Sequence, residues 1–242
     1  MNPLSPYDVL TLWEEGHGRA PFQKALLLAQ LARPQTSPDE LAAVPVDERD
    51  LLLLDLRERT LGPRLNAFAT CPACRQELEF TLEIPDVRAR VSRPVTRPEA
   101  VIGEFTFRLR RPSTEDLASI DLRDEMAASR AALAARCVVE ATRDGVTVDV
   151  RDIPKRALSR LADYLDELED PAEVLISMTC PACAHSWQAG FDIATYFYAE
   201  LSVLARRLLE EVHVLASAYG WSERDILAMS PARRQFYLER AR

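Results

Sequence analysis

The fold is decided by two matching stretches, Thr70-Cys71-Pro72-Ala73-Cys74 and Thr179-Cys180-Pro181-Ala182-Cys183. Each stretch separates its two cysteines by two residues, so that one tight turn can direct both sulfurs at a single ion. Two such turns supply the tetrahedral shell of four thiolates that Zn²⁺ accepts, and four thiolates leave no open position for water or substrate. The sequence therefore predicts one structural Zn²⁺ ion per chain, held by Cys71, Cys74, Cys180 and Cys183.

The separation of the two cysteine pairs is the unusual feature of the pattern, because residues 75–179 lie between them. A continuous zinc ribbon needs only a short connector. Apolar residues alternate from Leu78 to Ile84, which predicts a strand leaving the first pair. Residues 175–178 predict a strand entering the second pair, and residues 187–191 a strand leaving it. We therefore expect a split ribbon, with a strand-and-helix unit inserted between its halves.

Helical patterns occupy both ends of the chain. Caps and apolar spacings of three and four predict helices from Ser5 to a break at residues 16–18, over residues 21–32, and from an N-cap at Asp47 to residue 59. The longest predicted helix covers residues 193–219 and ends at a glycine. Two short helices are expected to begin at the serines of the C-terminal segment, Ser222 and Ser230.

The middle of the chain mixes strand and helix signals. Residues 85–98 are rich in proline and predict a connector, residues 105–109 alternate as a strand, and Ser113 with Asp116 predicts a helix start. A helical pattern continues over residues 127–139. A further stripe of leucines ends at Asp170–Pro171, and it consists of Leu158, Leu161, Leu165 and Leu168.

The expected fold class is α+β and mainly helical, with helices packed around a small split zinc ribbon formed by two CPAC knuckles. The chain is expected to divide into an N-terminal helical segment, the first half of the ribbon, the inserted strand-and-helix unit, the second half of the ribbon, and a long helix with a C-terminal tail. The residue ranges expected for these five segments are 1–64, 65–86, 87–171, 172–192 and 193–242.

Composition and charge limit the functional class. A hydrophobic content of 48% and a charged content of 28% are ordinary for a globular protein. The net charge of −8 disfavours a generic binder of nucleic acid or of an anionic membrane, since either needs a basic face. Residues 1–13 do not have the pattern of a signal peptide, and no apolar run approaches the ~20 residues of a membrane helix. We expect a cytoplasmic protein.

Two other readings of the cysteines remain open. A thiol oxidoreductase would use a single pair at a junction between a strand and a helix, whereas both pairs here lie between predicted strands. A zinc-ribbon regulator acting on nucleic acid would need a basic patch. Zinc knuckles often place glycine after the second cysteine, and this chain has Arg75 and Ala184 there. Cys137 lies in an apolar helical run and is interpreted as a core residue.

No catalytic constellation is recognisable, and we expect a protein that is not an enzyme. The three histidines, His17, His185 and His213, are scattered, although His185 follows the second cysteine pair closely enough to be a substitute ligand. The C-terminal residues 222–242 carry five arginines against three acidic residues, with aromatic residues between them. This segment is either a docked cap or a tail that binds a partner.

The chain resembles a T-even-type phage baseplate protein family, which has relatives in phage-tail-like contractile injection systems. The resemblance rests on residues 50–63 (DLLLLDLRERTLGP) before the first CPAC, on residues 180–193 (CPACAHSWQAGFDI), and on residues 211–234. It covers about residues 13–237 and is loose over residues 85–171.

This resemblance implies a non-enzymatic structural or assembly role in the baseplate or central hub of a contractile tail. It also implies that the four cysteines are metal ligands and that residues 219–234 form a motif of unassigned role. Baseplate, hub or spike proteins are the partners that the resemblance implies. From the net charge we expect neither nucleic acid nor a membrane to be bound. Whether the protein stays in the finished particle, and its oligomeric state, are left open.

Overall fold

The computed structural model describes residues 1–91, 99–121, 125–167 and 174–241. Within these residues the protein is an α+β molecule that is mainly helical, as the sequence predicts. The helices are α1 (Pro6–Gly16), α2 (Pro21–Ala32), α3 (Pro38–Ala43), α4 (Val46–Leu61), α5 (Ile84–Val91), α6 (Thr114–Ala118), α7 (Met126–Cys137), α8 (Lys155–Glu167), α9 (Ile193–Tyr219), α10 (Glu223–Leu227) and α11 (Pro231–Leu238), with a 3₁₀ turn at Val150–Asp152. The strands are β1 (Arg64–Thr70), β2 (Glu77–Glu83), β3 (Glu99–Ile102), β4 (Phe105–Leu109), β5 (Val138–Arg143), β6 (Val146–Val148), β7 (Val174–Thr179) and β8 (Ser186–Phe191).

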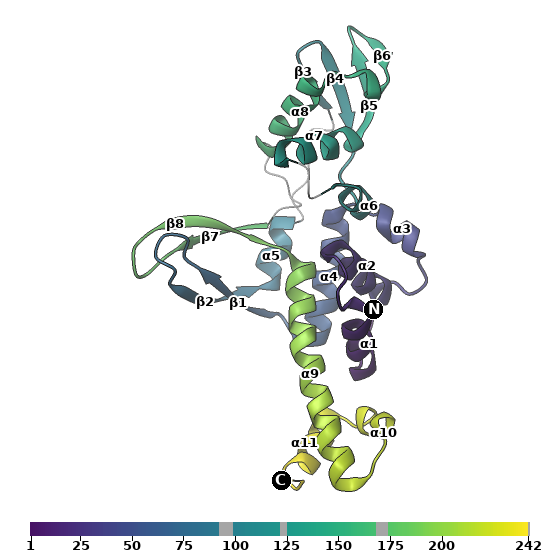
Figure 1. Ribbon diagram of the computed structural model, residues 1–242, viewed down its shortest axis with the longest axis vertical. Coiled ribbons are helices and arrows are strands. Elements are labelled where there is room, and N and C mark those ends of the chain that lie inside the picture. The colour runs from purple at the N-terminus through teal and green to yellow at the C-terminus, as the bar shows by residue number, and fades with distance from the viewer. Residues whose placement is uncertain (92–98, 122–124, 168–173, 242) are drawn as a thin grey trace.

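Helix α9 runs along the long direction of the molecule, from the base of the two cysteine-bearing hairpins to the C-terminal helices (Figure 1). Asp192 caps its first turn, because its Oδ1 atom accepts a hydrogen bond from the backbone N–H of Ala194 at 2.9 Å. Gly220 ends the helix with a φ of 69°, a conformation that glycine adopts without steric cost. The bounds of this helix are those predicted. Its apolar stripe packs against α1, α2, α4, α10 and α11 and includes Phe197, Leu201, Leu208 and Leu215.

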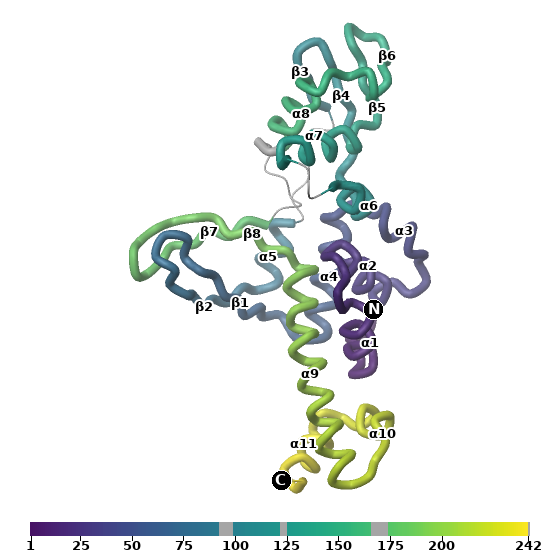
Figure 2. The backbone as a smooth tube through the Cα atoms, viewed as in Figure 1, coloured from purple at the N-terminus to yellow at the C-terminus, as the bar shows by residue number. Residues whose placement is uncertain are grey.

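The two cysteine-bearing hairpins form an arm that projects from one side of α9 (Figures 1 and 2). Strand β1 pairs antiparallel with β2, and β7 pairs antiparallel with β8. One face of each hairpin is apolar and joins the main hydrophobic core at the base of the arm, through Leu65 in β1 and through Val174 and Ile176 in β7. The core of the helical body, which consists of α1 to α5 and α9, therefore positions both halves of the arm.

A partly buried ion pair lies where the arm leaves the body. Nε and Nη2 of Arg57 in α4 donate to the two carboxylate oxygens of Glu200 in α9, at 2.9 and 2.6 Å. The hydroxyl of Tyr196, one turn earlier in α9, donates to the backbone carbonyl of Asn66 in β1 at 2.7 Å. It also lies 3.3 Å from a carboxylate oxygen of Glu200. This network joins α4, α9 and the first hairpin.

The inserted unit has a core of its own. Its antiparallel sheet has the order β3-β4-β5-β6, and α7 and α8 cover one face of that sheet. The buried side chains that meet there are Ala100, Phe105, Phe107, Ala134, Ala141, Ile153, Leu161 and Ala162. Figure 1 shows this unit at one end of the molecule and α10 and α11 at the other.

Helix α6 connects the inserted unit to the helical body. The backbone N–H of Val46 at the start of α4 donates to the carbonyl of Pro112 at 2.9 Å. Ser113 and Asp116 form the predicted capping box at the start of α6. The buried carboxylate of Asp116 also accepts hydrogen bonds from Arg110 and Arg136, at distances from 2.5 to 3.1 Å.

Some sequence predictions differ from the structure. Helix α5 begins at Ile84 and occupies the start of the predicted connector, because Pro85 lies in its first turn, where the missing N–H of proline costs nothing. Asp47 lies inside the first turn of α4, whose N-cap is Pro45. Residues 138 and 139 belong to β5 and not to a helix. Strands β1, β3 and β6 and helix α3 were not predicted. The predicted helix end at residues 168–171 lies outside the described residues.

Candidate metal centre

Each cysteine pair lies in a hairpin turn built from the same hydrogen bonds. In the first turn the backbone N–H of Cys71 donates to the carbonyl of Gln76, and the N–H of Arg75 donates to the carbonyl of Cys71, both at 2.9 Å. The second turn repeats these bonds, from Cys180 to His185 and from Ala184 to Cys180, also at 2.9 Å. Two segments far apart in sequence therefore form the same local structure.

The residue after each pair adopts a left-handed backbone conformation. Arg75 has a φ of 63° and Ala184 a φ of 57°, in the region that favours glycine. A left-handed residue costs roughly 1–2 kcal/mol when it carries a side chain. Both turns thus have a positive φ at the residue after the second cysteine, although glycine is at neither position.

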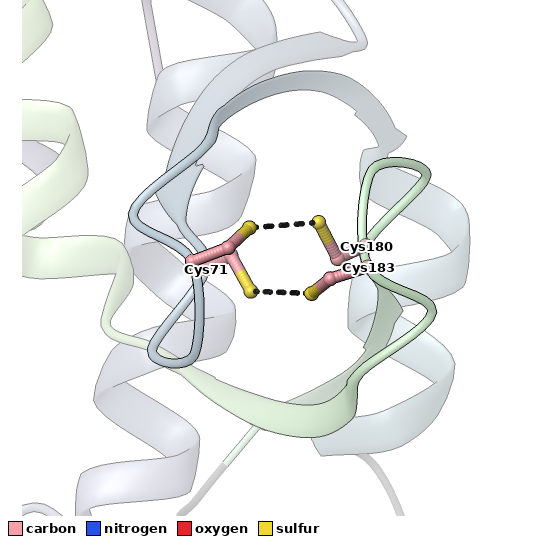
Figure 3. Close-up of side chains that lie close together, drawn as sticks. Cys71, Cys180 and Cys183 are labelled. Carbon is pink, nitrogen blue, oxygen red and sulfur yellow. Dashed lines mark hydrogen bonds between the residues drawn. The ribbon is translucent and has the colours of Figure 1, made fainter.

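The two turns face each other, and their four sulfurs meet. The Sγ atoms of Cys71 and Cys183 lie 3.7 Å apart, and those of Cys74 and Cys180 lie 3.6 Å apart. All four sulfurs lie within 4.8 Å of one another. Figure 3 shows the sulfurs of Cys180 and Cys183 pointing toward the turn that carries Cys71. The structure thus brings together all four cysteines that the sequence selects.

These distances fit a tetrahedral ion. A Zn–S bond of about 2.3 Å places the corners of a tetrahedron about 3.8 Å apart, close to the two short sulfur–sulfur distances. Cys71 and Cys180 are buried, whereas Cys74 and Cys183 are exposed at the end of the arm. An ion could therefore enter from the solvent side and be held from the protein side.

The close approach of the sulfurs separates the pKa values of two of the thiols. At Cys180 burial favours the neutral thiol, but hydrogen bonds from the backbone N–H groups of Cys183 and Ala182 outweigh it and lower its pKa to about 7. At Cys183 the N–H of His185 stabilises the thiolate, but the thiol of Cys74 and burial together raise its pKa to about 12. Neighbouring thiolates repel one another, which keeps Cys183 protonated, and a bound divalent cation would offset that repulsion and deprotonate the thiol.

The remaining candidates lie apart from this cluster. The ring of His185 stacks on Trp187 at 6.1 Å and is exposed, and it is not in the group that could hold a metal. Cys137 is buried in the inserted unit, as predicted for a core residue. Both cysteine pairs lie between antiparallel strands, and not at the junction of strand and helix that a thioredoxin-like pair occupies.

A family model described as T4 bacteriophage base plate protein matches residues 22–198 of the chain. The match covers most of the chain and includes nearly all of α2, all of α3 to α8, both cysteine turns and the inserted unit. This chain belongs to the T4 baseplate protein family. Neither curated proteins nor solved structures give a significant match to it.

Membership of the baseplate family indicates a structural role and contacts with other baseplate components. The match ends inside α9, so that most of α9 and the short helices α10 and α11 lie beyond it. No helix in the described part of this baseplate protein has both the length and the apolar character needed to cross a bilayer.

Sequence reasoning missed the residues that orient the arm of this baseplate protein. Arg57 and Glu200 are 143 positions apart, and each resembles an ordinary surface residue of an amphipathic helix in the sequence. Burial raises the pKa of Tyr196 to about 12, and the carboxylate of Glu200 adds to that shift. No local pattern predicts that these side chains meet at the base of the arm.

Proposed function

We propose that this baseplate protein is a non-enzymatic structural or assembly protein of the baseplate or central hub of a contractile phage tail, or of a phage-tail-like injection system. One structural Zn²⁺ ion joins the turns of the two hairpins at the end of the arm. The observation that carries the proposal is the meeting of four sulfurs, from two turns separated by residues 75–179, in a chain of the T4 baseplate family.

The ion would be held by Cys71, Cys74, Cys180 and Cys183, and it would supply a cross-link between the two hairpins. Closing a loop of this length stabilises a protein by roughly 4–5 kcal/mol through chain entropy. The two hairpins are also joined to the body by their apolar bases, so the ion mainly fixes the end of the arm. Four thiolates would complete the shell and leave the ion without a catalytic position.

The shape of the molecule supports a role in assembly. The arm, the inserted unit and the C-terminal helices extend in different directions from one helical body (Figure 1). Such projections can each meet a different neighbour, which suits a protein that joins components of a large particle. We propose hub or spike proteins as neighbours, and the cytoplasm of the producing cell as the place where assembly occurs.

The test is a strain that lacks this chain, complemented with the wild-type protein or with Cys180→Ser. We expect electron microscopy of the deletion strain to show tails without complete baseplates, and the wild-type chain to restore intact sheathed particles. Intact particles in the deletion strain would overturn the proposed role. Mass spectrometry of purified particles then distinguishes a component, which is present in them, from a factor that acts only during assembly.

A further inference from the structure

The outer face of the first hairpin combines a bare aromatic ring with acidic side chains. Phe68 in β1 is 74% exposed, and Glu79 in β2 is its direct cross-strand partner. Glu77 lies two pairs further toward the end of the arm, opposite Thr70, and therefore on the same face. The opposite face of the same hairpin joins the core, so the alternation of the strands directs these three side chains to solvent.

These two glutamates differ from the acidic residues that are already neutralised. At the base of the same hairpin, Glu83 pairs with Arg64 at 3.2 Å. Among the residues that the structure describes, neither Glu77 nor Glu79 has a basic partner. The outer face thus carries two uncompensated negative charges beside an exposed ring.

We infer that this face, formed by Phe68, Glu77 and Glu79, binds an arginine- or lysine-bearing segment of another protein. A guanidinium can lie on the face of an aromatic ring while its N–H groups reach a carboxylate. Because cross-strand neighbours lie about 5 Å apart, one arginine can contact Phe68 and Glu79 together. A second basic residue of the same segment would pair with Glu77.

Charge complementarity decides the class of partner. A single exposed phenylalanine is common on protein surfaces and carries no proposal by itself. Here the surrounding charge repels acidic segments and nucleic acid, and it favours basic protein segments. The inference rests on the proposed function, since it names the chemistry by which the arm would bind another baseplate protein.

The test uses the full chain with a photo-crosslinking phenylalanine analogue at position 68, produced in its own host during particle assembly. We expect it to crosslink one segment of a different protein that is rich in arginine or lysine. The charge reversal Glu79→Arg should lower the crosslink yield about tenfold, and changing the basic residue of the captured segment to glutamate should restore it. The same analogue at Val203, which is 69% exposed on α9, is the matched control.

Three outcomes overturn the inference. The captured segment could be neutral or acidic, or it could be a second copy of this chain attached through its basic C-terminal helices. The third is a crosslink yield at position 68 that equals the yield at the control position and does not change with Glu79→Arg. The proposed function fails separately. If the chain does not co-fractionate with baseplate proteins but position 68 still captures a basic segment in a charge-dependent way, the surface is confirmed and the baseplate role is not.

Discussion

The ring of Tyr198 in α9 fills the space beside Gly16 at the end of α1. A Cβ atom added at Gly16 would lie 2.3 Å from the nearest ring carbon of Tyr198, far inside contact distance. The ring cannot move away freely, because its hydroxyl donates to the backbone carbonyl of Trp13 at 3.0 Å and the side chain is buried. The glycine therefore permits α1 to pack closely against α9.

The first prediction is that Gly16→Ala destabilises the protein by about 1–3 kcal/mol, because the added methyl group overpacks this contact. Urea unfolding followed by circular dichroism measures the change. Glu15→Ala, on the exposed side of the same helix, is the control and should cost little. In a Tyr198→Ala background the cost of Gly16→Ala should largely disappear. An undiminished cost in that background would show that the ring is not its cause.

Local signals in the sequence predict many of the elements, and long-range contacts explain the failures. The bounds of α9 and β4 follow from a cap, a glycine and a clear alternation, all of which lie within the element. Strand β1 was missed because small residues, Ala67 and Ala69, occupy its apolar face and give a weak pattern. Its position depends on β2 and on Tyr196, which lie elsewhere in the chain.

The candidate metal centre shows the same division. The repeated CPAC motif identifies all four sulfurs, since each knuckle is a local structure. The absence of glycine after each pair looks unfavourable in the sequence, yet both turns keep a positive φ. The hydrogen bonds that close each turn hold Arg75 and Ala184 at a positive φ, against the preference of these residue types for a negative φ. The conformational propensity of the two residues alone cannot predict that outcome.

The second prediction concerns metal content. The wild-type protein should bind one Zn²⁺ per chain, and Cys180→Ser should bind none tightly and should unfold more readily, by roughly 4 kcal/mol, since the cross-link is lost. Elemental analysis of folded protein and thermal unfolding measure the two effects. Cys137→Ala removes a buried cysteine outside the cluster and should keep the metal. A folded wild-type preparation without metal would contradict the prediction.

The third prediction tests the left-handed turns. Ala184→Gly should stabilise the metal-bound protein by about 0.5–1 kcal/mol. Glycine removes the steric cost of a φ of 57°, and this gain exceeds the larger conformational entropy that glycine loses on folding. Ala182→Gly is the matched control, since Ala182 is in the same turn but does not have a positive φ. It should give no gain. Equal effects of the two substitutions, measured by urea unfolding, would refute this account of the knuckle.

The fourth prediction follows from the carboxylate of Asp116, which joins the inserted unit to the body. Burial alone would raise its pKa, but hydrogen bonds from Arg110 and from Ser113 outweigh burial and hold the pKa well below its usual range. A carboxyl whose pKa is lower in the folded state stabilises the protein above its unfolded pKa of about 3.9, and that stability is lost as the pH falls toward the folded value. Acid should therefore weaken the connection between the inserted unit and the helical body.

Asp116→Asn should consequently cost about 2–3 kcal/mol near neutral pH, because the amide cannot replace the charged acceptor between Arg110 and Arg136. The difference from wild type should stay constant from about pH 7 to about pH 5 and shrink as the pH falls further, since the carboxylate begins to lose its advantage over the unfolded state only near the unfolded pKa of about 3.9. Urea unfolding at several pH values measures it, and Glu115→Gln, an exposed neighbour, should show no such trend. A difference that stays constant with pH would mean that Asp116 acts through its shape and helix capping, and not through its charge.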